Sequence, residues 1–349
     1  MIPNRPPDGR LRAYAQFITA IFYYFMAGAL ARRGAQGLAS EQWAPLVDQA
    51  MLVFLLLAGY AGFGFMLNRQ THPISEQGLP RRQGWPGEIG IGLAIGWTIA
   101  LACVVAMAVM GGIHIGLSLG VSSWGWLIAD VLFYALGTLV EEIAFRGYGF
   151  QRFCRAVGPF GAALGFAALY AFLQAFLYGS NHASLAVSFM LSLLLSIAYL
   201  RTQALWVSWG LNFGWKASRA LIFGLTVSGA NGHSPIVQGT PMGPLWLTGG
   251  GFGVDGTWFA FILLLAALPA VYRATRELDF RYNAPEIIAA GVAVDLDAAA
   301  RRQHEAAMGP AEPAPPVLVQ ILPIITPPPA PTVDAKPETP AQISGNKSE

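Results

Sequence analysis

Long apolar runs are the feature of this sequence that most limits what it can fold into. A helix needs about 20 apolar residues to cross the hydrocarbon core of a bilayer. Eight largely apolar segments are close to this length: Ala13–Ala31, Gln49–Leu67, Ile89–Met110, Trp124–Leu139, Phe160–Tyr178, Ser184–Leu200, Leu205–Leu225 and Trp258–Tyr272. The sequence therefore predicts an all-α fold, a polytopic membrane helix bundle of about eight transmembrane helices.

Composition supports the same fold class and excludes others. Hydrophobic residues make up 54% of the 349-residue chain and charged residues only 11%, whereas soluble domains carry roughly 25% charged residues. The net charge is +2, and without a concentrated basic patch we expect no nucleic-acid partner. The two cysteines, Cys103 and Cys154, have no spacing typical of a disulfide framework or a zinc site.

Basic residues favour one orientation. If the N-terminus is cytoplasmic, the loops on the same side contain Arg69, Arg81, Arg82, Arg146, Arg152, Arg155, Arg201, Arg273, Arg276 and Arg281. The opposite loops contain Arg32, Arg33, Lys216 and Arg219. By the positive-inside rule, we predict an integral, multi-pass protein of a bacterial inner membrane with both termini in the cytoplasm. The first apolar run has no small-residue cleavage site after it, so we expect it to be retained.

The chain divides into four predicted regions. Residues 1–77 hold the first transmembrane helices and a loop, and residues 78–272 form the membrane core. Residues 273–308 form a charged juxtamembrane segment, and residues 309–349 form a tail rich in proline and alanine. Because such a tail cannot bury a core, we predict that it is disordered.

A charged motif directly follows the fourth apolar run. Glu142 and Arg146 are four residues apart, which places them on one helix face in the favourable order for an ion pair. Glu141 points about 100° away and is free to face a cavity, where it could act as a general base. The alternative is a charged helix end at the membrane interface, with Arg146 extended towards water.

At this motif, Glu141-Glu142-Ile143-Ala144-Phe145-Arg146-Gly147, the sequence resembles the CPBP intramembrane metalloprotease family. This family includes CAAX prenyl endopeptidases and bacteriocin-processing proteins. Further motifs that resemble the family lie at 78–85, 199–206, 210–216 and 243–250. The resemblance therefore covers residues 78–272 and implies cleavage of membrane-associated proteins.

The family resemblance also implies catalytic residues that this chain replaces. In the family, a histidine on the next core helix helps the first glutamate to activate water, and a later histidine and asparagine bind the attacked carbonyl or a metal such as zinc. The chain has Gln174, Asn212 and Lys216 at these positions. Amides and ammonium groups are poor zinc ligands, so we predict no cofactor. His182 lies about 12 Å further along than Gln174 and is not expected to substitute.

Three functions remain open at this stage. In an altered endopeptidase, Glu141 would act as the base, Gln174 would orient water, and Asn212 and Lys216 would stabilise an oxyanion. In a non-catalytic binding or scaffold protein, which we favour, Lys216 pairs with Glu141 or Glu142 in a buried ion network. A small transporter ranks last, because the sequence has no inverted repeat. The expected partners are membrane lipid and a membrane-associated protein or peptide.

Overall fold

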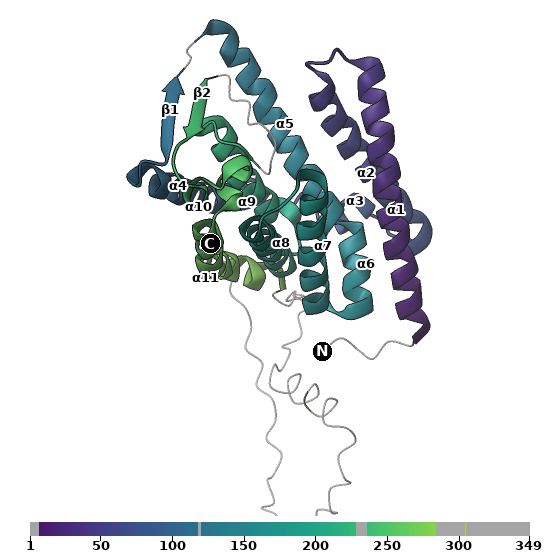
Figure 1. Cartoon of the computed structure of the whole chain (residues 1–349). Helices are drawn as coiled ribbons and strands as arrows, with labels where there is room; N and C mark the ends of the chain where they lie inside the picture. The colour runs from purple at the N-terminus through teal and green to yellow at the C-terminus, as the bar shows by residue number, and fades with distance from the viewer. Residues whose placement is uncertain (1–6, 118–119, 228–235, 284–303, 305–349) are drawn as a thin grey trace, which may run out of the picture. The chain divides into compact units, whose positions relative to one another are not determined.

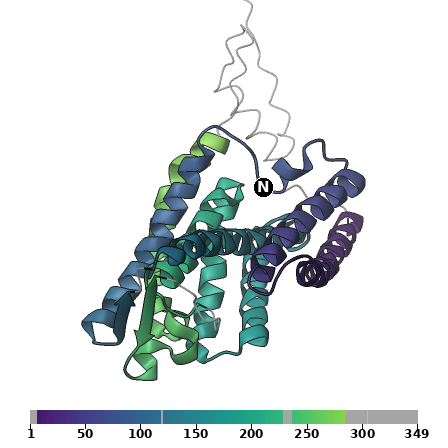
Figure 2. The same ribbon diagram turned by 90° about the horizontal axis from the view of Figure 1, so that it is seen from above.

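The computed structural model describes residues 7–117, 120–227, 236–283 and 304, and all but the last belong to one compact unit. Its helices are α1 (Pro7–Leu38), α2 (Ala44–Asn68), α3 (Pro73–Glu76), α4 (Trp85–Val109), α5 (Val121–Arg146), α6 (Tyr148–Val157), α7 (Pro159–Tyr178), α8 (His182–Thr202), α9 (Leu205–Ala217), α10 (Leu245–Thr248) and α11 (Trp258–Asn283). A π-helical turn, η1 (Ser218–Ile222), continues α9, and a 3-10 turn, η2 (Gly250–Gly256), precedes α11. Figures 1 and 2 place α1 and α2 on one side of the bundle and α4 and α11 on the other.

Each of the eight predicted spans lies mostly in a helix, and the structure confirms the all-α membrane bundle. Among the described residues, six helices are long and apolar enough to cross a bilayer: α1, α2, α4, α7, α8 and α11, the last counted together with η2. Helix α5 has 26 residues but carries four charged side chains, and α9 has only 13 residues before the π turn. These two less apolar helices are the ones that carry most of the predicted site.

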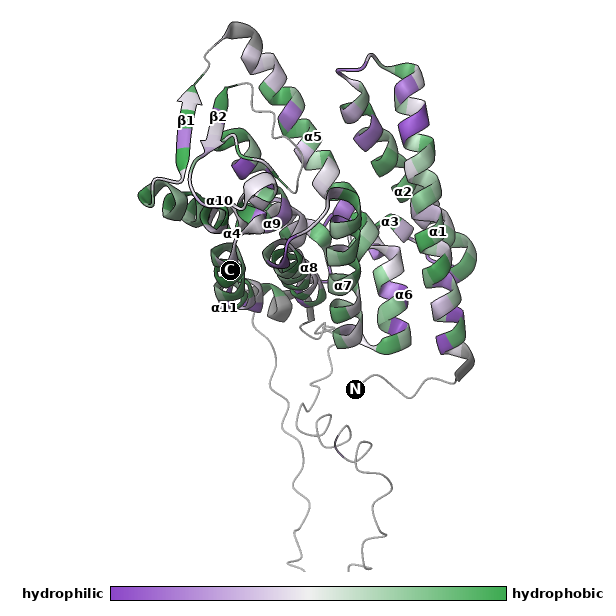
Figure 3. Ribbon diagram, in the orientation of Figure 1, coloured by the Kyte–Doolittle hydropathy of each residue, from purple (hydrophilic) through white to green (hydrophobic). Residues whose placement is uncertain are grey.

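The surface of this unit is apolar in the way that a lipid-facing surface requires. Figure 3 shows hydrophobic residues along most of the helices. Large side chains with more than half of their surface exposed include Phe54, Met66, Val109, Phe160, Phe172 and Phe176. Monomeric soluble proteins rarely expose so much contiguous apolar surface. The chain is an integral, multi-pass membrane protein.

Two of the connections between the predicted spans contain short strands. Strands β1 (Ile113–Leu117) and β2 (Val237–Pro241) form a two-stranded antiparallel sheet in which Ile113 pairs with Pro241 and Leu117 with Val237. Each strand has only five residues, and their pairing joins segments far apart in the chain. Hydropathy patterns are read within one segment, so they did not predict these two strands.

The predicted boundary at residue 272 falls inside a helix. Helix α11 begins at Trp258 and continues to Asn283, so hydropathy changes at residue 272 while the backbone stays helical. Of the charged region predicted for 273–308, the structure describes this last part of α11 and residue 304. The predicted disordered tail, 309–349, lies outside the described residues.

Glycines let α4 and α9 pack with their backbones in contact. A Cβ atom on Gly92 would meet the carbonyl oxygen of Val207, and one on Gly96 would meet that of Leu211. The same holds for α9, where Gly210 faces the α4 backbone at Ile89 and Gly214 faces it at Leu93. Glycines four residues apart on both helices form the small-residue contact typical of membrane helix pairs. This contact fixes the position of α9, which carries Asn212 and Lys216.

The start of α9 is held by the loop before α4. Arg82 forms a two-point ion pair with Glu88, with nitrogen–oxygen distances of 2.9 and 2.6 Å, and donates to the Thr202 carbonyl at 2.9 Å. Trp206 Nε1 donates to the carbonyl of Pro80 at 2.9 Å. Two of the motifs that carry the family resemblance, 78–85 and 199–206, therefore contact each other.

We predict that Gly96→Ala destabilises the protein because the new methyl group meets the α9 backbone. Overpacking of this kind costs about 1–3 kcal/mol, measured as a lower thermal unfolding midpoint in detergent. Gly90→Ala is the matched control, because no atom lies within 4 Å of a Cβ at Gly90 and alanine is the better helix former. Equal stability of the two variants would contradict the close packing of α4 and α9.

Candidate functional site

Two adjacent carboxylates near the end of α5 form the centre of the candidate site. The Glu142 side chain is completely buried, whereas 23% of the Glu141 side chain is exposed. Arg146 Nη1 donates to Glu142 Oε1 at 3.0 Å. The structure thus contains the predicted ion pair, and it is buried rather than placed at an exposed helix end. Glu141 alone has exposed surface, so it is the carboxylate that a substrate or water would approach.

Helix α8 holds Arg146 from the opposite side. Arg146 Nη2 donates to the carbonyl oxygen of Ser192 at 3.1 Å and to its hydroxyl at 3.0 Å. Our sequence prediction missed Ser192. A signal was present, because Ser184, Ser188, Ser192 and Ser196 recur at intervals of four residues in an otherwise apolar span. Such spacing forms a polar stripe along one face of a helix.

Helix α9 supplies two donors to the carboxylates. Asn212 Nδ2 donates to Glu141 Oε2 at 2.9 Å and to Glu142 Oε1 at 3.0 Å, so one amide bridges both glutamates. Lys216 Nζ lies 2.5 Å from Glu141 Oε1. Because Asn212 and Lys216 are one helical turn apart, their side chains reach the same pair of carboxylates. The π turn η1 begins two residues after Lys216, and such turns often occur at functional sites.

Gln174 reaches the carboxylates only through a tyrosine. Its Nε2 donates to the hydroxyl of Tyr170 at 3.0 Å, and that hydroxyl donates to Glu141 Oε2 at 3.4 Å. Gln174 also lines a small pocket between α7, α8 and η2. The structure therefore brings all six predicted site residues into one network, five of them in direct contact and Gln174 one residue removed. Tyr170 also belongs to this network, although the sequence analysis did not assign it to the site.

The formal charges of this network cancel. Glu141 and Glu142 contribute two negative charges, and Arg146 and Lys216 contribute two positive charges. In a low-dielectric interior, an unpaired charge costs several kcal/mol, while a paired and hydrogen-bonded one is tolerated. Both oxygens of Glu141 accept hydrogen bonds, one from Lys216 and the other from Asn212. The site is a charge-balanced arrangement of protein groups.

The donor set does not fit a catalytic zinc ion, which takes three protein ligands as a rule. Among the described residues, no three His, Cys, Asp or Glu side chains come together in a way that could hold a metal. The only oxygen of the two carboxylates without a hydrogen-bond partner in this region is Glu142 Oε2. The Lys216 ammonium lies against Glu141, the remaining carboxylate. No chemical step at this site is therefore assigned to a metal.

Three of the four described histidines lie on elements that contribute no contact to Glu141 or Glu142. His72 precedes α3, His114 is on β1, and His182 is the first residue of α8. The contacts to Glu141 and Glu142 instead come from Arg146, Tyr170, Asn212 and Lys216, as given above. His233 lies outside the described residues.

Comparison with known proteins gives one match. Residues 123–218 match the family model described as Rce1-like, type II CAAX prenyl endopeptidase. No curated protein and no solved structure matches the chain. The matched segment runs from the start of α5 to the end of α9 and contains every residue of the network. This match confirms the resemblance to CAAX-type intramembrane proteases that the glutamate motif indicated.

We predict that Arg146→Met strongly destabilises the protein because it leaves the Glu142 carboxylate buried without its charged partner. Removing one member of a buried ion pair costs about 3–5 kcal/mol, which thermal or denaturant unfolding in detergent would measure. The double variant Glu142→Leu/Arg146→Met removes both charges and should recover much of this loss. If the double variant is less stable than the single one, the pair is not what stabilises the site.

Proposed function

Starting from the match of residues 123–218 to the type II CAAX prenyl endopeptidases, we propose that this protein keeps the fold of that family without its peptidase activity. Its role is then that of a membrane-embedded binding or scaffold protein for a membrane-associated protein or peptide. The proposal includes the orientation that the loop charges favour, with both termini in the cytoplasm of a bacterial cell.

The observation that carries this proposal is the contact between Lys216 and Glu141. A general base must have a carboxylate oxygen within hydrogen-bond reach of the water it deprotonates. In this chain the two oxygens of Glu141 already accept from the Lys216 ammonium at 2.5 Å and the Asn212 amide at 2.9 Å. Breaking the contact with Lys216 would leave two opposite charges uncompensated at depth. Both oxygens of Glu141 are thus engaged by protein groups, although part of the side chain is exposed.

A second argument concerns the neighbours of Glu141. Activation of water in the family is attributed to the glutamate together with a histidine, and the chain has Gln174 in that place. An amide has no basic nitrogen and does not take up a proton at neutral pH. Gln174 is moreover in contact with Tyr170 rather than with the carboxylates. The arrangement offers hydrogen-bond donors to a carboxylate, and the position of the family's histidine has no group that takes up a proton.

We predict that the purified protein does not cleave a prenylated CAAX peptide in detergent or in proteoliposomes. The measurement is release of the C-terminal tripeptide, with Glu141→Gln as the comparison and an active family member as the positive control. Cleavage by the unaltered chain that disappears in Glu141→Gln would refute the proposal and favour an altered endopeptidase with Glu141 as the base.

We also predict that the triple variant Gln174→His, Asn212→His and Lys216→Asn acquires zinc. Two imidazoles together with the Glu141 carboxylate make three protein ligands, the number found in catalytic zinc sites. Removal of Lys216 releases that carboxylate from its ion pair. Metal content of the purified protein measures the gain, with Gln174→His alone as the control because it adds a single ligand. A triple variant that folds normally but binds no more zinc than the control would contradict our placement of these residues around one centre.

A further inference from the structure

A second buried ion pair lies close to the carboxylate network. Arg219, on the π turn η1, has its Nη1 atom 2.7 Å from Oδ1 of Asp255 in η2, and the two side chains are 0% and 8% exposed. The Arg219 guanidinium carbon also lies 4.0 Å from the centre of the Trp215 ring, and Nε donates to the Trp215 carbonyl at 2.9 Å. A buried arginine needs a nearby negative charge to offset its loss of hydration. The position of Arg219 therefore depends on Asp255.

Arg219 follows Lys216 by three residues, at the point where the helix changes its geometry. Helix α9 ends at Ala217, and the π turn η1 begins at Ser218. Lys216, whose ammonium lies 2.5 Å from Glu141 Oε1, is thus in the last turn of α9. Residues three apart on a helix are neighbours on its surface. A contact that fixes Arg219 therefore also fixes the end of the helix from which Lys216 reaches Glu141.

The η2 turn, which carries Asp255, is tightly folded through glycines. Gly249, just before the turn, and Gly253, within it, have φ values of 68° and 59°, a region that residues with a side chain disfavour. A Cβ atom on Gly249 would meet the carbonyl oxygen of Gly253, and one on Gly253 would meet that of Thr226. Thr226 lies four residues after the end of η1. The backbone of η2 therefore packs against the segment that leaves the end of α9.

The same turn reaches two other helices. Asn181, which caps the start of α8, donates to the carbonyl of Gly256 at 3.3 Å. A pocket of about 20 Å³ between α7, α8 and η2 is lined by both Gln174 and Asp255. The turn thus borders α7, which carries Gln174, and is joined by an ion pair to the end of α9, which carries Lys216. It lies beside two of the helices that build the network.

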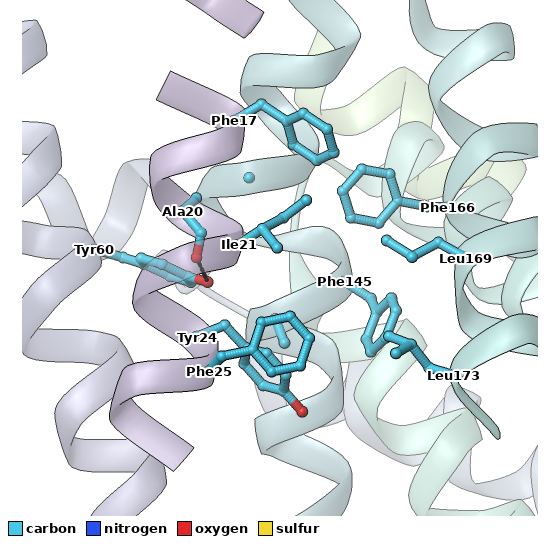
Figure 4. Close-up of a pocket in the computed structure, with 12 residues that line it drawn as sticks. Phe17, Ala20, Ile21, Tyr24, Phe25, Tyr60, Phe145, Phe166, Leu169 and Leu173 are labelled. Atoms are coloured by element: carbon cyan, nitrogen blue, oxygen red, sulfur yellow. Dashed lines mark hydrogen bonds between the residues drawn. The ribbon is translucent and has the colours of Figure 1, made fainter. Parts of the chain in front are cut away.

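The other face of α7 borders a pocket of a different kind. Figure 4 shows this pocket between α1 and α7, where Phe17 and Ile21 of α1 face Phe166 and Leu169 of α7. Its volume is about 50 Å³, and its described lining has no charged side chain. Of these two pockets on α7, only the one beside η2 contains a charged group, Asp255. Charged support for the end of α9 therefore comes from the η2 side.

We propose that η2 is a strap that keeps Lys216 on Glu141, with Asp255 as a positioning residue that acts through Arg219. The strap holds the end of α9 in place, and the Lys216 ammonium then stays within reach of the carboxylate. When the strap is released, Arg219 loses Asp255 as its partner, the end of α9 moves, and Glu141 is freed from its ion pair. This inference goes beyond the proposed function, because the strap sets the state of Glu141 whether or not the chain cleaves peptides.

The test measures how readily an uncharged acetylating reagent modifies Lys216 in the full-length protein in neutral detergent. An ammonium held in an ion pair has no lone pair with which to attack the reagent. Peptide mass spectrometry gives the extent of modification, and the other two lysines of the chain, Lys336 and Lys347, are the internal reference. We expect Asp255→Asn to raise the relative modification of Lys216 about tenfold, which corresponds to a coupling of about 1.4 kcal/mol. Glu141→Gln, which removes the pair directly, sets the upper limit.

Glu88→Gln is the matched control for a general loosening of the bundle. It removes the ion pair with Arg82 near the other end of α9, where Arg82 also donates to the Thr202 carbonyl. We expect this variant to leave the modification of Lys216 unchanged. An equal rise in Glu88→Gln, or no rise in Asp255→Asn, would overturn the proposal.

A second pair of variants tests the strap with Asp255 in place. Gly253→Ala puts a methyl group against the Thr226 carbonyl at a φ that alanine disfavours, whereas Gly251→Ala in the same turn has no described atom within 4 Å of its new methyl group. We expect Gly253→Ala to raise the modification of Lys216 and Gly251→Ala to leave it unchanged. Equal modification in these two variants would refute the role of η2. Peptide cleavage by the unaltered chain would refute the proposed function without altering these results.

Discussion

Neutralising two adjacent carboxylates inside a helix bundle is the constraint on which the rest of the site depends. Glu141 and Glu142 follow each other on α5, and the residue one turn after Glu141 is Phe145, so this helix offers a cation to Glu142 only. Arg146, one turn further on the same helix, serves Glu142 at 3.0 Å. Glu141 needs a cation from another element, and Lys216 of α9 provides it at 2.5 Å. The amide of Asn212 then joins the two pairs into one network.

This network requires α9 to lie at a fixed place, and glycines meet that requirement. Gly92 and Gly96 of α4 and Gly210 and Gly214 of α9 bring the backbones of the two helices into direct contact. The helix that carries Asn212 and Lys216 is thereby held by backbone contact on one face, while its other face turns to the carboxylates. A membrane protein gains little from apolar burial between helices, because lipid is equally apolar, so close backbone packing has greater weight.

Charged groups in this bundle differ in how far neighbouring groups compensate their charge. The central network is balanced, and Arg219 on the π turn has its own partner, with Nη1 2.7 Å from Asp255 Oδ1. Arg152 differs from both because its described contacts are with an amide oxygen and an aromatic ring rather than with a carboxylate. The contrast is physically informative: buried charges that serve only the fold are expected to be paired within it. For Arg152, neutral groups take that place among the described residues.

The sequence by itself determined the class of fold, the position of the apolar helices and the ion pair of Glu142 and Arg146, because each depends on spacing within one segment. Hydropathy over about 20 residues and a separation of four residues are local properties. The partner of Glu141 was left between alternatives, since nothing in one helix specifies which of its neighbours faces it. Only the tertiary structure decided that Lys216 pairs with Glu141, that Tyr170 stands between Gln174 and the carboxylates, and that β1 pairs with β2. These features depend on how separate segments approach one another, and that approach is set by backbone packing such as the contact at Gly96, which acts across the fold rather than along the chain.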